Sequence, residues 1–143
     1  MAKESTLVGY FTHSGNTRVI AEHIRAVTGG DLFRIETVDS YPQDYDAAVE
    51  VARTELRANV RPRLAEDVTD LVSYMVISIG CPIWWATMPM AVFAFLENHD
   101  LSGMKVVPFC THEGSGLWRS VRDISDLCPK FIIVDDLAVR AET

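Results

Sequence analysis

The residues after the first apolar segment are rich in hydrogen-bond donors. This loop reads THSGNT and carries the hydroxyl side chains of Thr12, Ser14 and Thr17, the Asn16 amide and one glycine, Gly15. Because a helical pattern follows, unpaired N–H groups and a positive partial charge are expected at the loop, and these can hold a phosphate without Lys or Arg. The side-chain donors add to that cradle, and the glycine lets the backbone close around the anion. The pattern predicts a phosphate-binding loop.

Two later loops combine aromatic or small polar residues. In GCPIWWATMP, successive residues tend to point in different directions. We therefore expect one of Trp84 and Trp85 to pack inward and the other to offer a flat face to a planar ligand. The backbone amides of CTHEGSG could donate to the polar edge of a heterocycle. Together the loops indicate a ligand with a phosphate at one end and an aromatic ring system at the other.

Other phosphate chemistries do not fit the residues present. The chain lacks both G-x-x-x-x-G-K-[ST] and G-x-G-x-x-G, and a loop without lysine favours a phosphate monoester that is bound rather than transferred. A response-regulator receiver needs acidic residues after the first strand and an Asp after the third, where this chain has Thr12, His13 and Cys81. A small tyrosine phosphatase needs C-x5-R, and no Cys has an Arg at that interval. We assign no catalytic residue and no metal site.

Apolar runs alternate with helical patterns along the chain. The run YMVISI is β-branched without strict alternation, which is typical of a strand buried on both faces of a parallel sheet. We predict strands at Leu7–Phe11, Leu32–Ile35, Tyr74–Ile79, Val106–Phe109 and Phe131–Val134. Helices are predicted over Thr17–Val27, from Tyr45 to Leu56, after Pro89 and from Leu117 to Cys128.

This alternation predicts one α/β domain over residues 1–143, with three α/β/α layers. Five strands in a chain of this length favour a five-stranded parallel sheet of order 2-1-3-4-5. In that order the ligand crevice lies beyond the carboxyl ends of the first and third strands, where the first two loops fall.

Composition narrows the classes of partner. The chain has 143 residues and a net charge of −7, without a Lys/Arg cluster, which argues against nucleic acid and favours basic protein partners. No secretory h-region and no apolar run of membrane-spanning length is present, so a soluble cytoplasmic protein is expected, without a membrane partner. Cys81, Cys110 and Cys128 lack metal or disulfide spacing and are expected to be free thiols.

The three loops resemble those of short flavodoxin-type proteins. THSGNT is similar to the family's phosphate loop T/S-x-T/S-G-x-T, PIWW resembles its tryptophan-bearing flavin loop, and CTHEGSG stands where its second flavin loop belongs. YPQDY followed by RP, and VVPFCTHEGSG, resemble one subgroup of flavodoxin-like proteins. The similarity runs from about Thr6 to Arg140 and implies a flavodoxin-like fold that binds flavin mononucleotide (FMN).

The resemblance also implies which residues contact FMN. Phosphate contacts are expected from Thr12, His13, Ser14, Gly15, Asn16 and Thr17. Flavin contacts are expected from Pro82, Ile83, Trp84, Trp85, Thr111, His112, Glu113, Gly114, Ser115 and Gly116. The two histidines are interpreted as hydrogen-bond donors near the flavin or as exposed residues, and not as catalytic groups.

Two features depart from the family pattern. The second flavin loop has no Tyr to cover the outer ring face, which would leave that face open to a substrate. The terminal helix is apparently missing, since only nine residues, Asp135 to Thr143, follow the last predicted strand. An apolar strip near the third to fifth strands would then face water, which predicts either a homodimer through that face or a tail folded over it.

Two functions remain open. The first is an electron-transfer protein whose FMN cycles between oxidised, semiquinone and hydroquinone states, with redox partner proteins that have basic surfaces. The second is an FMN-dependent NAD(P)H oxidoreductase that acts on a quinone or a similar acceptor. The open ring face and the possible dimer favour the second function, whereas no nicotinamide site is recognisable.

Overall fold

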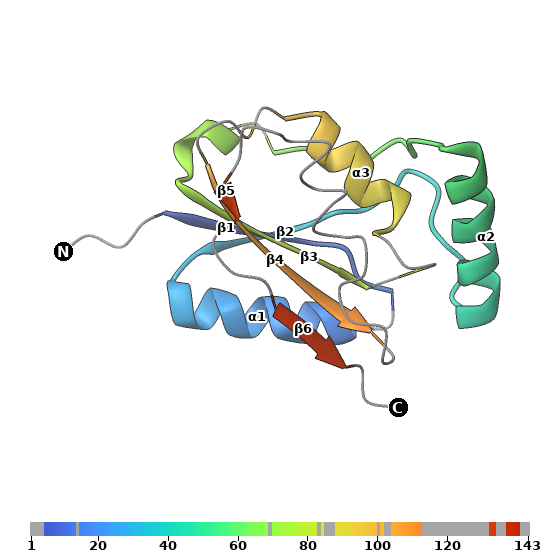
Figure 1. The fold of residues 1–143 in the computed structure, drawn as a ribbon, viewed down its shortest axis with the longest axis horizontal. Coiled ribbons are helices and arrows are strands. Elements are labelled where there is room, and N and C mark those ends of the chain that lie inside the picture. Colours follow the sequence, from blue (N-terminus) through green and yellow to red (C-terminus); the bar gives the residue numbers. More distant parts are fainter. Residues whose placement is uncertain are drawn as a thin grey trace.

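A computed structural model describes residues 5–13, 15–68, 70–82, 84, 88–99, 101, 104–112, 132–133 and 137–140. Strands and helices alternate, as the sequence predicts (Figure 1). The elements are β1 (Thr6–Tyr10), α1 (Asn16–Thr28), β2 (Asp31–Arg34), α2 (Tyr45–Ala58), the short 3-10 helix η1 (Leu71–Ser73), β3 (Val76–Pro82), α3 (Met90–Glu97), β4 (Lys105–His112), β5 (Ile132–Ile133) and β6 (Leu137–Arg140). The helix predicted from Leu117 to Cys128 lies outside the described residues.

The sheet is parallel, and its order confirms the predicted arrangement of the first four strands. β1 pairs with β2 on one side and with β3 on the other, and β3 pairs with β4. The order β2-β1-β3-β4 creates the predicted switch point at the carboxyl ends of β1 and β3. The two loops whose chemistry the sequence singles out therefore start beside each other.

Beyond β4, the structure differs in part from the sequence prediction. The predicted strand Phe131–Val134 corresponds to β5, which is shorter, and a further short strand, β6, also pairs with β4. β5 pairs with the start of β4 and β6 with its end, over Phe109 to His112. Strand β6 was not predicted, because LAVR is too short to show a period of its own and its pairing partner is distant in sequence.

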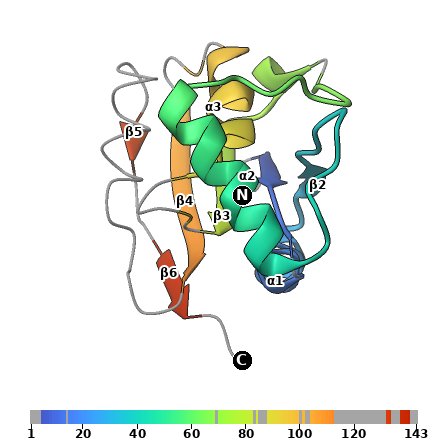
Figure 2. The same cartoon turned by 90° about the vertical axis from the view of Figure 1, so that its right-hand side faces the viewer.

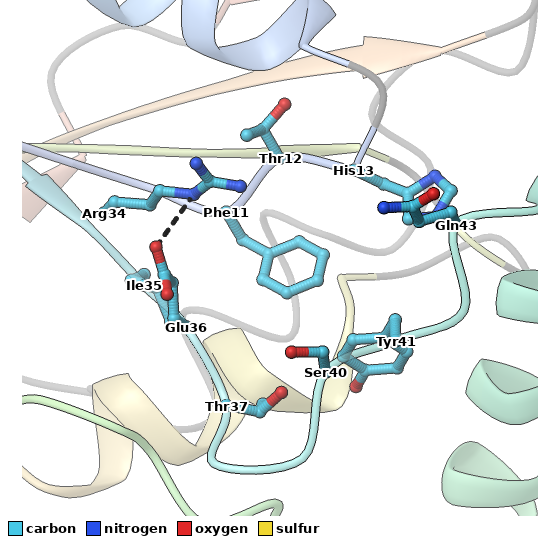
Figure 3. A pocket seen from close by; sticks show the side chains of 10 residues that line it. All are labelled: Phe11, Thr12, His13, Arg34, Ile35, Glu36, Thr37, Ser40, Tyr41 and Gln43. Atoms are coloured by element: carbon cyan, nitrogen blue, oxygen red, sulfur yellow. Dashed lines mark ion pairs between the residues drawn. The ribbon is translucent and has the colours of Figure 1, made fainter.

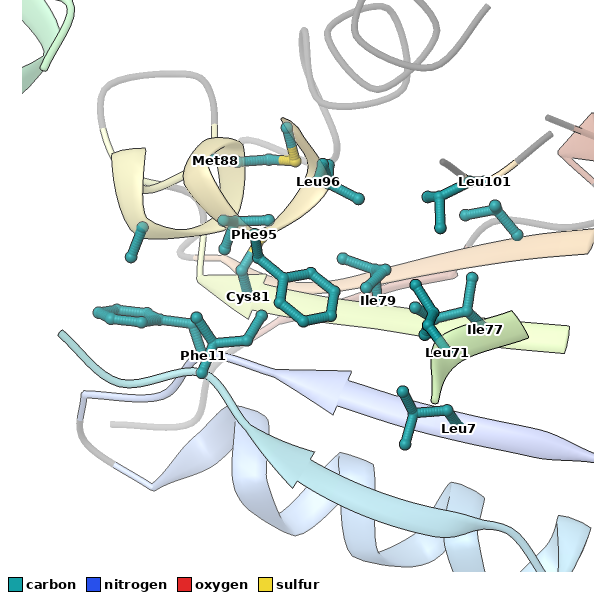
Figure 4. Packing of buried hydrophobic residues seen from close by; sticks show 14 of the residues in the cluster. Leu7, Phe11, Leu71, Ile77, Ile79, Cys81, Met88, Phe95, Leu96 and Leu101 are labelled. Atoms are coloured by element: carbon teal, nitrogen blue, oxygen red, sulfur yellow. The ribbon is translucent and has the colours of Figure 1, made fainter. Parts of the chain in front are cut away.

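Helices cover both faces of the sheet (Figures 1 and 2). Helix α1 lies on one face, and α3 lies on the other with α2 beside it. The larger core belongs to the α3 side, where side chains from β1, β3 and α3 interlock (Figure 4). Phe95 is fully buried in this core, and Ile77 and Ile79 project from β3 into the same cluster.

The α1 face is closed by a side chain from β4. Phe109 packs with Val8, Tyr10 and Ala21 and is only 1% exposed. It fits because Gly80, its neighbour on β3, has no side chain, and a Cβ there would lie 2.0 Å from the Phe109 ring. At this position the sheet face is thus covered within the single chain, and the homodimer stays a prediction.

Local signals define the helix ends. Asp44 caps α2 by accepting a hydrogen bond from the Ala47 N–H at 3.0 Å, and α2 ends at Asn59 in the left-handed conformation. Gly29 ends α1 in the same way, with φ +70°. None of the described helices has both the length and the apolar character needed to cross a membrane.

Candidate functional site

The predicted phosphate loop connects the carboxyl end of β1 to the first turn of α1. Gly15 is the residue before the helix, and its φ of +98° is a left-handed conformation that favours glycine. The Gly15 N–H donates to Thr12 Oγ1 at 3.1 Å, which folds the loop back on itself. Thr12 and Thr17 are buried at 8% and 2% exposure. The loop before α1 is thus fixed by this hydrogen bond and by two buried threonines.

The start of α1 suits an anion. Gly15 has no side chain with which to cap the helix, and the first turn of α1 contains no acidic residue. Backbone N–H groups of a first turn have no partner inside the helix and carry positive partial charge. A phosphate monoester is the complementary group for such a helix end, so the residues present fit FMN at its phosphate.

His13 joins this loop to the segment between β2 and α2. Its Nε2 lies 2.7 Å from the Pro42 carbonyl oxygen. A carbonyl only accepts hydrogen bonds, so Nε2 carries the proton in this contact. The other ring nitrogen, Nδ1, is buried and has no protein partner among the described side chains. A buried ring nitrogen without a partner is uncommon in folded proteins, so the hydrogen bonding at this point of the site is incomplete among the described residues.

Trp84, the first of the two adjacent tryptophans, packs inward. It is 4% exposed, and its ring lies 5.5 Å from Phe11, 5.6 Å from Tyr41 and 5.8 Å from His13, between ring centroids. Edge-to-face contacts of this kind stabilise an aromatic cluster. The Trp84 ring thereby supports the phosphate loop through His13. Trp85 lies outside the described residues.

The two predicted flavin loops begin side by side. Pro82 at the end of β3 is paired with Thr111 on β4, and His112 follows as the last residue of β4. The remaining predicted flavin contacts, and one predicted phosphate contact, lie outside the described residues: Ser14, Ile83, Trp85, Glu113, Gly114, Ser115 and Gly116. The described part of the site thus contains most of the predicted phosphate loop and the paired ends of β3 and β4, from which the predicted flavin loops start.

Cys81 and Cys110 lie opposite each other on β3 and β4, just before these strand ends. Both are buried and neither forms a disulfide bond among the described residues, as their spacing predicts, while Cys128 lies outside the described part. Burial, and then the neighbouring Cys110, raise the pKa of the Cys81 thiol. A raised pKa keeps the thiol protonated, so Cys81 packs as a small apolar side chain and does not act as a nucleophile.

The segment between β2 and α2 contributes groups that sequence reasoning did not assign to the site. It crosses Phe11 and is anchored by hydrogen bonds to residues 63–65 and by the Tyr41 hydroxyl, which donates to the Glu55 carboxylate on α2 (Figure 3). Burial raises the pKa of Glu55, and the hydrogen bond from Tyr41 partly opposes that rise. Burial and Glu55 together raise the pKa of Tyr41. The motif YPQDY was the only sequence signal for this segment.

No metal site accompanies the loop in the described residues, since three His, Cys, Asp or Glu side chains do not meet there. The fold and the site define an α/β protein of the flavodoxin-like class, with a glycine-containing loop before α1 at the switch point of its sheet. A family model described as flavodoxin (Flavodoxin_4) matches residues 5–140. The chain belongs to this flavodoxin family.

Solved structures agree with this assignment. A protein of Bacteroides eggerthii DSM 20697 that is proposed to be a flavoprotein is 30% identical to this chain, with a TM-score of 0.86, and the match covers 94% of this chain and 87% of that one. A flavoprotein from Lactobacillus acidophilus NCFM, solved in complex with FMN, is 20% identical, with a TM-score of 0.81 and coverage of 94% and 93%. Megasphaera elsdenii flavodoxin is also 20% identical, with a TM-score of 0.59 and coverage of 94% and 85%. None of the proteins with curated descriptions matches the chain.

Proposed function

We propose that this protein binds FMN and transfers electrons. The observation that carries the proposal is the uncapped start of α1, preceded by the left-handed Gly15 and the buried Thr12, at the switch point of a flavodoxin-type sheet. FMN in the similar Lactobacillus flavoprotein supports the same cofactor here. Bound FMN would supply one-electron and two-electron redox chemistry, while the protein supplies binding and electrostatics.

The residues of the loop would hold the phosphate end. First-turn N–H groups of α1 donate to the phosphate, and the Asn16 amide and the Thr12 hydroxyl add donors beside them. The ring would lie across the paired ends of β3 and β4, where Pro82 and Thr111 begin the two flavin loops. Because Trp84 packs inward, the neighbouring Trp85 would be the tryptophan that contacts the flavin ring.

Electrostatics would select the redox partner. The net charge of −7 attracts proteins with basic surfaces and speeds their encounter at low ionic strength. Salt screens charges over about 8–10 Å under physiological conditions, so electron transfer to such a partner should slow as salt is added. A homodimer would add a second copy of the same acidic surface.

FMN binding is tested by titrating the purified full chain and following flavin absorbance and fluorescence. We expect FMN to bind and riboflavin, which lacks the phosphate, to bind at least tenfold more weakly, about the value of one charge-assisted hydrogen bond. Thr12→Val should weaken FMN more than riboflavin. Thr54→Val, on the exposed side of α2, is the matched control. Equal affinities for the two flavins would contradict the phosphate loop.

The alternative function is an FMN-dependent NAD(P)H oxidoreductase that reduces a quinone or a similar acceptor. A second flavin loop without Tyr supports it, because an uncovered ring face would admit a substrate. Oxidation of NADH or NADPH by the FMN-loaded protein, followed at the nicotinamide absorbance band, separates the two. Turnover with an added quinone would favour the oxidoreductase, and its absence would favour the electron carrier.

A further inference from the structure

A cavity lies on the β2 side of the phosphate loop, between the end of β2 and the segment that precedes α2. Its volume is about 420 Å³, within the range of roughly 300–1,000 Å³ that small-molecule sites occupy. Phe11 and Ile35, both buried, form its apolar part. Figure 3 shows the Phe11 ring between the end of β2 and the segment that carries Ser40 and Tyr41.

The two ends of this cavity differ in chemistry. One end is the phosphate loop itself, through Thr12 and His13. At the other end, Arg34 Nε and Glu36 Oε1 form an ion pair of 3.2 Å at the exit of β2. Their side chains are 46% and 58% exposed, so both remain accessible to a ligand. A molecule that fills the cavity would extend from the phosphate position to a carboxylate and a guanidinium.

We propose that this cavity binds an adenosine 5′-phosphate group, as an extension of the phosphate site; this rests on the proposed function. In α/β folds that bind dinucleotides, phosphates lie at the loop after the first strand. A carboxylate after the second strand, about 20 residues further on, accepts the ribose hydroxyls. Glu36 follows β2 at about that distance from Gly15, and the cavity lies between them.

The chemistry of the other lining groups matches this ligand. A carboxylate such as Glu36 accepts the hydrogens of both ribose hydroxyls, the Arg34 guanidinium beside it holds that carboxylate, and the 5′-phosphate would lie at the phosphate loop. The base would lie against the apolar side chains of Phe11 and Tyr41, and Gln43 offers an amide to its polar edge. These are the three parts of a nucleoside phosphate.

His13 closes the cavity toward the segment before α2. Its Nε2 donates to the Pro42 carbonyl oxygen at 2.7 Å, which joins the phosphate loop to that segment. This contact fixes the loop end of the cavity, so a ligand would enter a preformed site.

The same adenosine phosphate occurs in two redox cofactors. In FAD it is joined to the flavin phosphate, so one molecule would occupy the loop and the cavity together. In NADH or NADPH it would bind beside FMN and place the nicotinamide within the same crevice. Two arms of one experiment distinguish these sources.

The first arm compares FMN, FAD and AMP on the full chain without flavin, by calorimetry and by amide chemical shifts of residues 34–43. We expect AMP to bind and FAD to bind about tenfold more tightly than FMN, if FAD is the source. The second arm titrates the FMN-saturated protein with NADH and NADPH under anaerobic conditions. Tight binding there, with FAD no better than FMN, identifies the nicotinamide cofactors as the source.

Glu36→Gln tests the residue. The Glu36 side chain is mostly exposed, and the hydrogen bond that Glu36 accepts from the Ala65 N–H uses its backbone oxygen. The variant should therefore fold. We expect affinity for AMP and for the adenosine-containing cofactor to fall about tenfold, with FMN affinity unchanged. Glu50→Gln, which breaks an exposed ion pair on α2, is the matched control.

The outcomes separate this inference from the proposed function. FMN binding without any AMP, FAD or NAD(P)H binding attributable to the adenosine group overturns the inference and leaves the function standing. AMP binding that Glu36→Gln does not weaken also overturns it. AMP binding that depends on Glu36 in a protein that binds neither flavin would support the inference and remove the FMN proposal.

Discussion

The contact between Gly80 and Phe109 allows a stability prediction to be worked from the structure. A Cβ added at Gly80 would lie 2.0, 2.1 and 2.6 Å from three carbons of the Phe109 ring. Carbon atoms in contact are normally about 3.5–4.0 Å apart, so the ring would have to move by more than an ångström. Phe109 is 1% exposed and packs against Val8, Tyr10 and Ala21, which leaves it no space to move into.

We expect Gly80→Ala to lower the free energy of unfolding by about 3 kcal/mol. Overpacking of a core costs about 1–3 kcal/mol, and loss of a buried Phe costs about 3–5 kcal/mol. The alanine variant lies between these cases, because the ring is either compressed or pushed out of the cluster. Urea unfolding followed by circular dichroism measures the difference.

Gly9→Ala on β1 is the matched control. A Cβ at Gly9 would have its nearest neighbour, Ile79 Cδ1, at 3.4 Å, which is an ordinary contact. We expect this change to alter the free energy of unfolding by less than about 1 kcal/mol, since alanine also favours a strand over glycine. Comparing the two variants therefore shows whether the loss of stability at Gly80 comes from the collision with Phe109 or from replacing any sheet glycine with alanine.

A double-mutant cycle identifies the ring as the cause. Phe109→Ala alone should cost about 3–5 kcal/mol. Gly80→Ala should then be nearly neutral in the Phe109→Ala background, because the ring that it collides with is gone. If Gly80→Ala costs the same with and without the ring, or no more than Gly9→Ala, the steric reasoning is refuted.

Three further predictions follow from the site. Gly15→Ala should lower the free energy of unfolding by about 1–2 kcal/mol through its φ of +98° alone, because nothing lies within 4 Å of its Cβ; unchanged urea unfolding would contradict this. Tyr41→Phe should destabilise the fold more as the pH rises above the ordinary Glu pKa of 4.5, because burying the ionised Glu55 carboxylate without its hydrogen-bond donor costs more than burying the neutral acid. Unfolding curves measured between pH 4 and 8 test this, and Glu55→Gln should remove the pH dependence. Cys81 and Cys110 should react with a thiol reagent only upon unfolding, and rapid labelling of the native protein would show that they are not buried.

The sign for Glu55 follows from proton linkage. Its pKa is raised in the folded state, so the folded protein holds a proton there at pH values where the unfolded chain has released it. Folding stability contributed by this group is therefore present below pH 4.5 and is lost as the pH rises through the folded pKa. The hydrogen bond from Tyr41 reduces this loss, which is why its removal enlarges the slope.

Much of the architecture and one end of the site were predictable from local sequence. The apolar runs and helical periods predicted the four strands of the order β2-β1-β3-β4 and three described helices to within a few residues. THSGNT predicted a donor-rich loop, and Gly15 indeed adopts a conformation that favours glycine. These features depend on residues close together in the chain, where turn chemistry and periodicity act directly.

Only the tertiary structure decided which side chains meet. Trp84 packs inward because Phe11 and Tyr41, from two other segments, surround its ring. Arg34 and Glu36 border a cavity because the segment before α2 arches over Phe11. Phe109 covers Gly80 because the register of β3 against β4 places them side by side. Each contact joins residues distant in sequence, and no local pattern encodes the register or the arch that brings them together.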